Sequence, residues 1–370
     1  MSKRIYKELA AFHPGYYIQD MLDDMEITQS EFARRLNTTS KTLSNLLAGK
    51  IDLSEDLAEK LAQMTGVSIG TWLRLQAQYA EKRCEIECRE KLDQEQTVFK
   101  QINAKYFMDL GVLREDMSVE EKIAAFRTYF QVAELAVLME PDLLTACRTS
   151  IRTIAPKNVI NANVWIQTGM NLARKVSCEV FSERALRKAV PRLRSMTQSP
   201  LSTVFADIRR LLADCGIAMV ALPYLPQSGL SGAVKWLNNE KVMLLINDRG
   251  RDTAKFWFTL FHEIRHIQQK KKSFVYLTAK DKNAQEMLSL GRNNFAEEAD
   301  ADAFAQEELI PSRLYETFVS RGDFSKEGIQ AFARSIQISD AIVLGRLQHD
   351  EYVNWNWHKG LVQTYRFVAV

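Results

Sequence analysis

The sequence predicts a mostly α-helical protein that carries one small antiparallel β-sheet, an α+β combination. Two observations predict this fold class. Capped segments with helical periodicity recur over most of the chain. Three short apolar segments at 215–222, 229–236 and 241–247 instead have the length of strands, with turn residues between the last two. A chain of 370 residues is also long enough for two or three domains with separate cores.

We expect three parts along the chain. Residues 1–80 form a domain of short capped helices. Residues 81–200 are charged and helix-rich without a motif, and we expect a connector that supplies dimer or sensor surface, with one long helix over 81–107. Residues 201–370 contain the strands, a buried helix and a helical C-terminal tail.

Bulk composition is that of an ordinary globular protein, with 46% hydrophobic and 26% charged residues. The net charge of +3 is too small to indicate nucleic-acid binding by itself. An odd number of scattered cysteines suits a reducing compartment, and the sequence has neither a signal peptide nor an apolar run of about 18 residues. We therefore expect a cytoplasmic protein without a membrane span. The cysteines form no zinc-knuckle pattern; they are Cys84, Cys88, Cys147, Cys178 and Cys215.

Two short helices near the N-terminus are joined by a tight polar turn. Thr28 at the N-cap and Glu31 three residues later form a capping box for the first helix. Residues 37–39 end it, and a second helix runs from Ser40 to a left-handed cap at Gly49. This arrangement is typical of a helix-turn-helix.

The second of these helices has short polar side chains on the face opposite its leucines. Such side chains suit a major groove, where they reach base edges and phosphates, and Lys50 after the cap suits a phosphate contact. An ordinary structural helix pair stays open, because the acidic set Asp20, Asp23, Asp24 and Glu26 keeps the region from being basic overall. The predicted DNA-binding residues are Gln29, Ser40, Lys41, Thr42, Ser44, Asn45 and Lys50.

Residues 13–79 resemble HigA-type antitoxins of the Xre/Cro repressor class. The similarity lies in HPGxxI, TQSEFARRL, SxxTLSNLLAGK and AEKLAQMTGVSxxTWLRLQAQY. The resemblance implies a five-helix, lambda-repressor-like domain and a homodimer on a palindromic double-stranded operator. It also implies a cognate toxin as a partner.

A second motif, HExxH, occupies residues 262–266 on a segment with helical periodicity. Residues four apart share one face of a helix, so His262 and His266 can bind one metal ion. Glu263 follows the first histidine, where its carboxylate can take a proton from a water on that metal. Large apolar residues around the motif indicate a buried, rigid helix.

A catalytic zinc site requires a third protein ligand, and residues 297–305 offer the best candidate. Glu298 and Asp302 lie four apart on a second predicted helix whose small alanines permit close packing. Glu298 would bind the metal, and Asp302 would accept a hydrogen bond from a ligand imidazole. Glu297 is the competing ligand, on a different face from Asp302.

The two segments FTLFHEIRH and EADADAFAQEELIP resemble the ImmA/IrrE family of bacterial and phage metallo-endopeptidases. The resemblance implies a zincin-like domain with one Zn²⁺ per chain, bound by His262, His266 and Glu298, and Glu263 as the general base. The sequence departs from the family pattern in two places: Asp300 replaces an inner Glu, and Arg265 replaces the usual Gly.

Two further features border this motif. Residues 231–234 are our candidate for an exposed edge strand that binds a peptide by strand addition, although a plain structural hairpin is equally plausible. His349 ends a terminal helix that could fold back on the cleft, where it would stabilise a transition state or bind substrate. A surface histidine is the alternative.

These observations favour a DNA-binding, antitoxin-like repressor that carries a zinc-dependent endopeptidase domain. The peptidase would hydrolyse a peptide bond in a regulatory partner or in the protein itself. The alternative is a non-catalytic antitoxin or repressor whose zinc domain is a toxin-binding or sensing platform.

Overall fold

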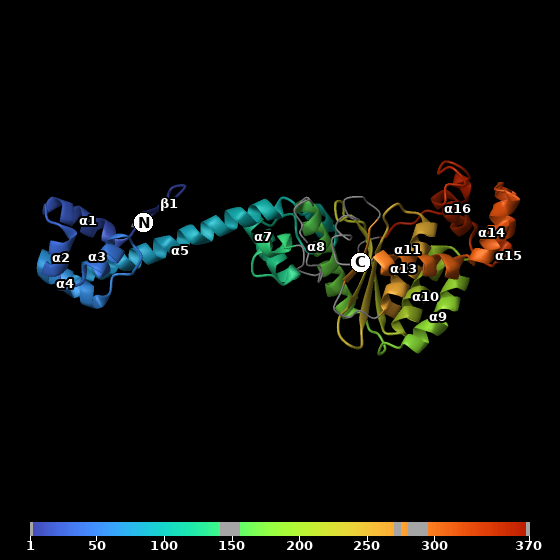
Figure 1. Ribbon diagram of the computed structural model, residues 1–370, viewed down its shortest axis with the longest axis horizontal. Coiled ribbons are helices and arrows are strands. Elements are labelled where there is room, and N and C mark those ends of the chain that lie inside the picture. The colour runs from blue at the N-terminus through green and yellow to red at the C-terminus, as the bar shows by residue number, and fades with distance from the viewer. Residues whose placement is uncertain (1–2, 141–155, 270–274, 280–294, 368–370) are drawn as a thin grey trace. The chain divides into compact units, whose positions relative to one another are not determined.

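The computed structural model describes residues 3–140, 156–269, 275–279 and 295–367 (Figure 1). The chain divides into two compact units, Met1–Thr97 and Val98–Val370. Both are mainly helical, with a two-stranded sheet in the first and a four-stranded sheet in the second, in agreement with the predicted fold class. The domain boundaries predicted near residues 80 and 200 stay predictions. Within the described ranges, no helix is both long and apolar enough to cross a membrane.

The first unit contains five helices around a core of leucines, Phe32 and Trp72. The side chains of Leu73 and Leu75 are partly buried and also pack against this core. The helices are α1 (Pro14–Asp24), α2 (Gln29–Arg35), α3 (Ser40–Leu47), α4 (Glu55–Thr65) and α5 (Ile69–Phe99).

Local capping explains where these helices begin. His13 accepts the Gly15 N–H through Nδ1 at 2.9 Å and so caps α1. Gly15 also permits close packing, because a Cβ there would lie 2.1 Å from the Leu46 carbonyl oxygen of α3. At α2, Thr28 Oγ1 accepts the Glu31 N–H at 3.2 Å. The Glu31 carboxylate pairs with Arg35, so only half of the predicted capping box forms.

A β-hairpin that the sequence did not reveal packs on α5. Its strands are β1 (Lys3–Tyr6) and β2 (Leu9–Phe12). Ala11 is buried with two residues of α5, and Arg4 of β1 forms ion pairs with two α5 carboxylates. The prediction of one helix over 81–107 was wrong at both ends, because α5 already begins at Ile69. The helix α5 stops at Phe99, and Asn103 caps the new helix α6 (Ala104–Asp109).

The second unit contains a mixed sheet with the strand order β3-β5-β4-β6. The strands are β3 (Ile217–Leu222), β4 (Leu230–Trp236), β5 (Val242–Asn247) and β6 (Val275–Ala279). The first three lie where the sequence predicts them, but β3 runs parallel to β5, whereas an antiparallel sheet was expected. The edge-strand prediction for residues 231–234 was wrong, because β4 is hydrogen-bonded to β5 on one side and β6 on the other.

Helices cover both faces of this sheet (Figure 1). Helix α8 (Pro156–Lys175) packs on one face, where Gly169 lies against the Leu245 side chain. Helices α10 (Leu201–Ala213) and α11 (Thr253–Gln269) pack on the other face, which is lined by Leu244, Ile246 and their neighbours. Because both faces are covered, the middle strand β5 is buried along its whole length and is apolar up to Asn247.

Helix α13 (Phe295–Leu309) packs beside α11 and contributes Ala301 and Ala305, both buried. The aromatic residues Tyr365 and Phe367 of the C-terminal tail contact Phe256 of α11. Among the residues that the structure describes, this unit also contains α7 (Val119–Phe130), η1 (Leu135–Met139), α9 (Glu183–Met196), α14 (Ser312–Arg321), α15 (Lys326–Ser335), α16 (Asp340–His349) and η2 (Lys359–Leu361).

Candidate metal centre and nucleic-acid interface

Helix α11 brings its two histidines together inside the second unit. His262 and His266 are one helical turn apart, and their Nε2 atoms lie 2.9 Å from each other. Both rings are buried, because the sheet, α13 and α16 all pack against α11.

Glu298 of α13 completes a group of three candidate ligands. Its Oε2 lies 3.3 Å from His262 Nε2, and its Oε1 lies 3.2 Å from His266 Nε2. One ligand atom from each of these residues lies within 4.8 Å of the other two. Glu297, the competing candidate, does not belong to this group, and its backbone carbonyl accepts a hydrogen bond from Gln269 at 3.0 Å.

Outer hydrogen bonds orient both rings. The carboxylate of Asp302 lies 2.8 Å from His262 Nδ1, the position that the sequence assigned to it. Gln269 Oε1 lies 2.8 Å from His266 Nδ1. Carboxylate and carbonyl oxygens only accept, so each Nδ1 donates a proton to its outer partner, and each Nε2 faces Glu298.

Two imidazole nitrogens and one carboxylate therefore converge on one point, where a positive charge, carried by a proton or by a metal ion, stabilises the carboxylate. Burial opposes a charge on His262, but the hydrogen bonds to Asp302 and Glu298 and the nearby Glu263 charge raise its pKa to about 10. Burial likewise opposes ionisation of Glu298, but its hydrogen bonds with both histidines lower its pKa to about 2. The arrangement of His262, His266 and Glu298 thus fits a metal cation.

Glu263 follows the first histidine and is completely buried at 0% exposure. It lies against Gly232 of β4, where a Cβ would be 2.2 Å from Glu263 Oε1. Only glycine leaves room for the carboxylate at this point of the strand. The sequence analysis did not single out Gly232, although a glycine inside a strand signals a close approach.

His349 is exposed, whereas His262, Glu263 and His266 are buried. Its side chain at the end of α16 is 69% exposed, and its Nδ1 lies 3.0 Å from Asp350 Oδ1. It does not belong to the group of described residues with converging ligand atoms. A role for His349 in substrate binding or catalysis stays a prediction.

In the first unit, the turn between α2 and α3 contains Asn37 in a left-handed conformation with φ of 50°. Helix α3 turns Leu43, Leu46 and Leu47 into the core. The predicted DNA-binding residues lie outside this core. Gln29, Ser40, Lys41, Ser44 and Lys50 are exposed, and Thr42 and Asn45 are half-buried.

Comparisons with known proteins agree with this first unit. The family model described as helix-turn-helix matches residues 18–72. An uncharacterized HTH-type transcriptional regulator, YddM of Escherichia coli (strain K12), is 41% identical over 63 residues, which are 17% of this chain and 67% of that protein. Virulence-associated protein A' of Dichelobacter nodosus is 35% identical over 81 residues, which are 22% of this chain and 70% of that protein.

A crystal structure from Nostoc punctiforme, named for an antidote protein of a plasmid maintenance system, covers 23% of this chain and 92% of its own. It is 28% identical, with a TM-score of 0.22 that is too low to compare the folds. The two curated relatives exceed 30% identity over two thirds of their length. Through its first unit, this chain therefore belongs to the helix-turn-helix family, whose fold implies DNA binding.

Proposed function

We propose that this protein is an antitoxin-like, DNA-binding transcriptional regulator whose second unit is a zinc-dependent endopeptidase. The observation that carries the peptidase assignment is the group of His262, His266 and Glu298 with the buried Glu263 one residue after the first ligand. The similarity of residues 262–266 and 297–311 to ImmA/IrrE metallo-endopeptidases supports the same assignment.

At the DNA end, α3 is the recognition helix. Its first residues are exposed, so Ser40, Lys41 and Ser44 can enter a major groove while the leucines behind them hold the helix in place. Lys41 and Lys50 would contact phosphates, and Asn45 would reach a base edge. A homodimer would place two such helices about 34 Å apart on a palindromic operator.

The donor set suits zinc, since two imidazole nitrogens and one carboxylate leave a fourth position open. Zn²⁺ bound there would act as a Lewis acid on a peptide carbonyl and on a water molecule. Asp302 and Gln269 hold the Nδ1 atoms of the two histidines, so both Nε2 atoms would be available to bind the cation.

Glu263 would perform the proton transfers. Its carboxylate is buried beside Gly232, and its charge acts on His262, where it helps to raise the pKa of that imidazole. It would accept the proton of the attacking water and deliver it to the leaving amine nitrogen. The hydrolysed bond would lie in a regulatory partner, such as a toxin, or in this chain, and cleavage would lift repression.

The variant Glu263→Gln tests this function, with Glu316→Gln on the exposed face of α14 as the control. We expect Glu263→Gln to retain metal and DNA affinity but to abolish proteolysis, because the amide cannot accept the proton. The measurement is identification of new protein termini in cells that produce wild type, Glu263→Gln or Glu316→Gln. Termini that appear with wild type and Glu316→Gln but not with Glu263→Gln would reveal the cleaved bond.

Cleavage products that appear equally with Glu263→Gln would contradict the peptidase assignment. A full regulatory effect of Glu263→Gln in cells, without cleavage by any of the three proteins, would favour the non-catalytic platform instead.

A further inference from the structure

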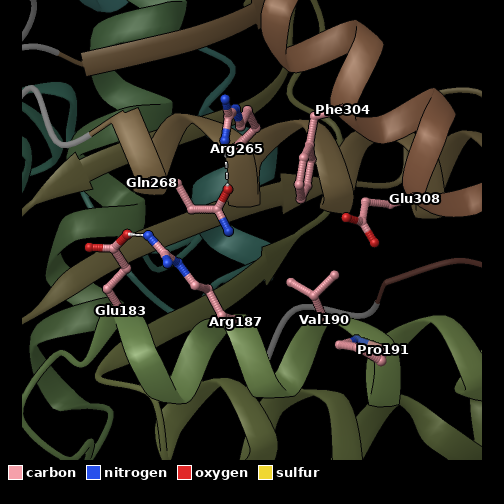
Figure 2. Close-up of a pocket in the computed structure, with 8 residues that line it drawn as sticks. All are labelled: Glu183, Arg187, Val190, Pro191, Arg265, Gln268, Phe304 and Glu308. Atoms are coloured by element: carbon pink, nitrogen blue, oxygen red, sulfur yellow. Dashed lines mark hydrogen bonds and ion pairs between the residues drawn. The ribbon is translucent and has the colours of Figure 1, made fainter.

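Arg265 lies between the two candidate ligand histidines in sequence but points away from them. Figure 2 shows it at a groove bordered by α9 and by residues of α11 and α13. Its guanidinium lies 5.4 Å from the centre of the Phe304 ring, and its Nη1 donates to Gln268 Oε1 at 3.2 Å. The side chain is 34% exposed, so Arg265 is held by specific contacts rather than by burial.

The strongest of these contacts joins α11 to α13. Arg265 Nε donates to Asp300 Oδ2 at 2.8 Å, and Nη2 donates to Asp300 Oδ1 at 3.0 Å. Two parallel bonds of this kind fix the carboxylate in one plane as well as in place.

Asp300 in turn fixes Gln269, which lies one turn of α11 after Arg265. Gln269 Nε2 donates to Asp300 Oδ2 at 2.8 Å and to the Glu297 carbonyl at 3.0 Å. Both amide hydrogens are therefore directed at acceptors, and the amide oxygen faces His266 Nδ1 at 2.8 Å. A flipped amide would bring its oxygen against two other oxygens, so only one orientation is favourable.

We propose that Arg265, Asp300 and Gln269 form a positioning relay that fixes the ring orientation and tautomer of His266 for metal binding. The two residues that depart from the peptidase family pattern, Arg265 and Asp300, are thus partners of each other. The relay rests on the proposed metal site. It differs from the support of His262, which a single, largely exposed carboxylate supplies.

Zinc affinity of the purified full-length protein, measured by competition with a chromogenic chelator, tests the relay. Loss of an outer hydrogen-bond partner lowers metal affinity about 10–100-fold. We expect this loss for Gln269→Ala and a smaller loss for Asp300→Asn and Arg265→Ala. Arg265→Lys should fall between wild type and Arg265→Ala, because it keeps the charge but not the two parallel bonds.

The double variant Arg265→Ala/Asp300→Asn should bind zinc no more weakly than the weaker single variant, since both substitutions interrupt one relay. Arg187→Ala is the matched control. Arg187 borders the same groove, but it pairs with Glu183 of its own helix and should leave zinc affinity unchanged (Figure 2). Visible spectra of the cobalt-loaded proteins should change for Gln269→Ala and not for Arg187→Ala, because only the first alters a ligand orientation.

Unchanged zinc affinity in Gln269→Ala and Asp300→Asn would overturn the relay while leaving the metal site intact. Equal losses in Arg187→Ala would also overturn it, since the effect would then be a general loosening of the groove. Absence of zinc binding by wild type would overturn the proposed function and the relay together. Circular dichroism of each metal-free variant separates these outcomes from failure to fold.

Discussion

The helices α3 and α11, which carry most of the residues of the two candidate sites, differ in whether they expose or bury their functional side chains. On α3, leucines face the core and polar residues face solvent, so stability and function reside in different side chains. On α11, the polar residues His262, Glu263 and His266 are buried among aromatic and aliphatic side chains. A surface site can change without loss of the fold, whereas a buried polar site is part of the core.

Burial explains why α11 requires so many partners. A polar group removed from water costs free energy unless it is hydrogen-bonded, and a buried charge costs more. Each ligand histidine therefore has an outer partner, Asp302 or Gln269, that the solvated residues of α3 do not need. The predictions below test this contrast, from the largest expected effect to the smallest.

Glu298→Ala should produce the largest change. It removes one of the ligands, so we expect zinc affinity to fall more than about 100-fold, with DNA affinity unchanged. Glu297→Ala, one residue earlier and outside the ligand group, is the control and should keep its metal. Zinc content after dialysis measures both. Loss of zinc in Glu297→Ala alone would reverse the ligand assignment.

Gly232→Ala should reduce proteolysis more than metal binding. The new Cβ would lie 2.2 Å from Glu263 Oε1 and so displace this buried carboxylate. We expect cleavage to slow about 10–100-fold, less than the roughly 10²–10⁴-fold that a general base contributes, because the carboxylate is displaced and not removed. Gly360→Ala is the control, because a Cβ there meets nothing within 4 Å. Zinc loss equal to the loss of cleavage would show that Gly232 supports the fold rather than Glu263.

Lys41→Ala should weaken DNA binding without destabilising the first unit. A lost phosphate contact lowers affinity for all sequences and reduces the slope of log affinity against log salt by about 1. Fluorescence anisotropy with a duplex that wild type selects from a randomised library measures this slope. Lys326→Ala, an exposed lysine of α15, is the control. An unchanged slope for Lys41→Ala would remove α3 from the DNA interface.

Thr39→Ala should have the smallest effect, and on stability alone. Thr39 Oγ1 caps α3 by accepting the Thr42 N–H at 3.0 Å, and loss of an N-cap costs about 1 kcal/mol. Amide hydrogen exchange measures this loss of stability. We expect faster exchange in peptides from α2 to α4 and unchanged exchange in α11. Equal exchange in wild type and Thr39→Ala would show that the cap contributes nothing to this unit.

Sequence spacing predicted those parts of the site that lie on one helix or repeat at helical intervals. The HExxH pair and the pair Glu298 and Asp302 each follow from four-residue periodicity. The strands β3, β4 and β5 were located from their apolar runs and turns. These features depend on neighbours a few residues away.

The features that the sequence did not reveal depend on distant partners. Residues 231–234 have the pattern of an edge strand, but β6, about 40 residues later, pairs with them. The roles of Gly232 and Gln269 come from contacts with residues about 30 positions away on other elements. The hairpin at residues 3–12 is stabilised by α5, more than 70 residues further along the chain.

X-ray absorption spectroscopy of the zinc-loaded full-length protein tests the central claim most directly, because it reports the atoms around the metal. If His262, His266 and Glu298 bind the ion, the spectrum should contain two imidazoles and carboxylate oxygen at about 2.0–2.2 Å. Sulfur at about 2.3 Å would place the zinc on cysteines instead and contradict the proposed metal centre.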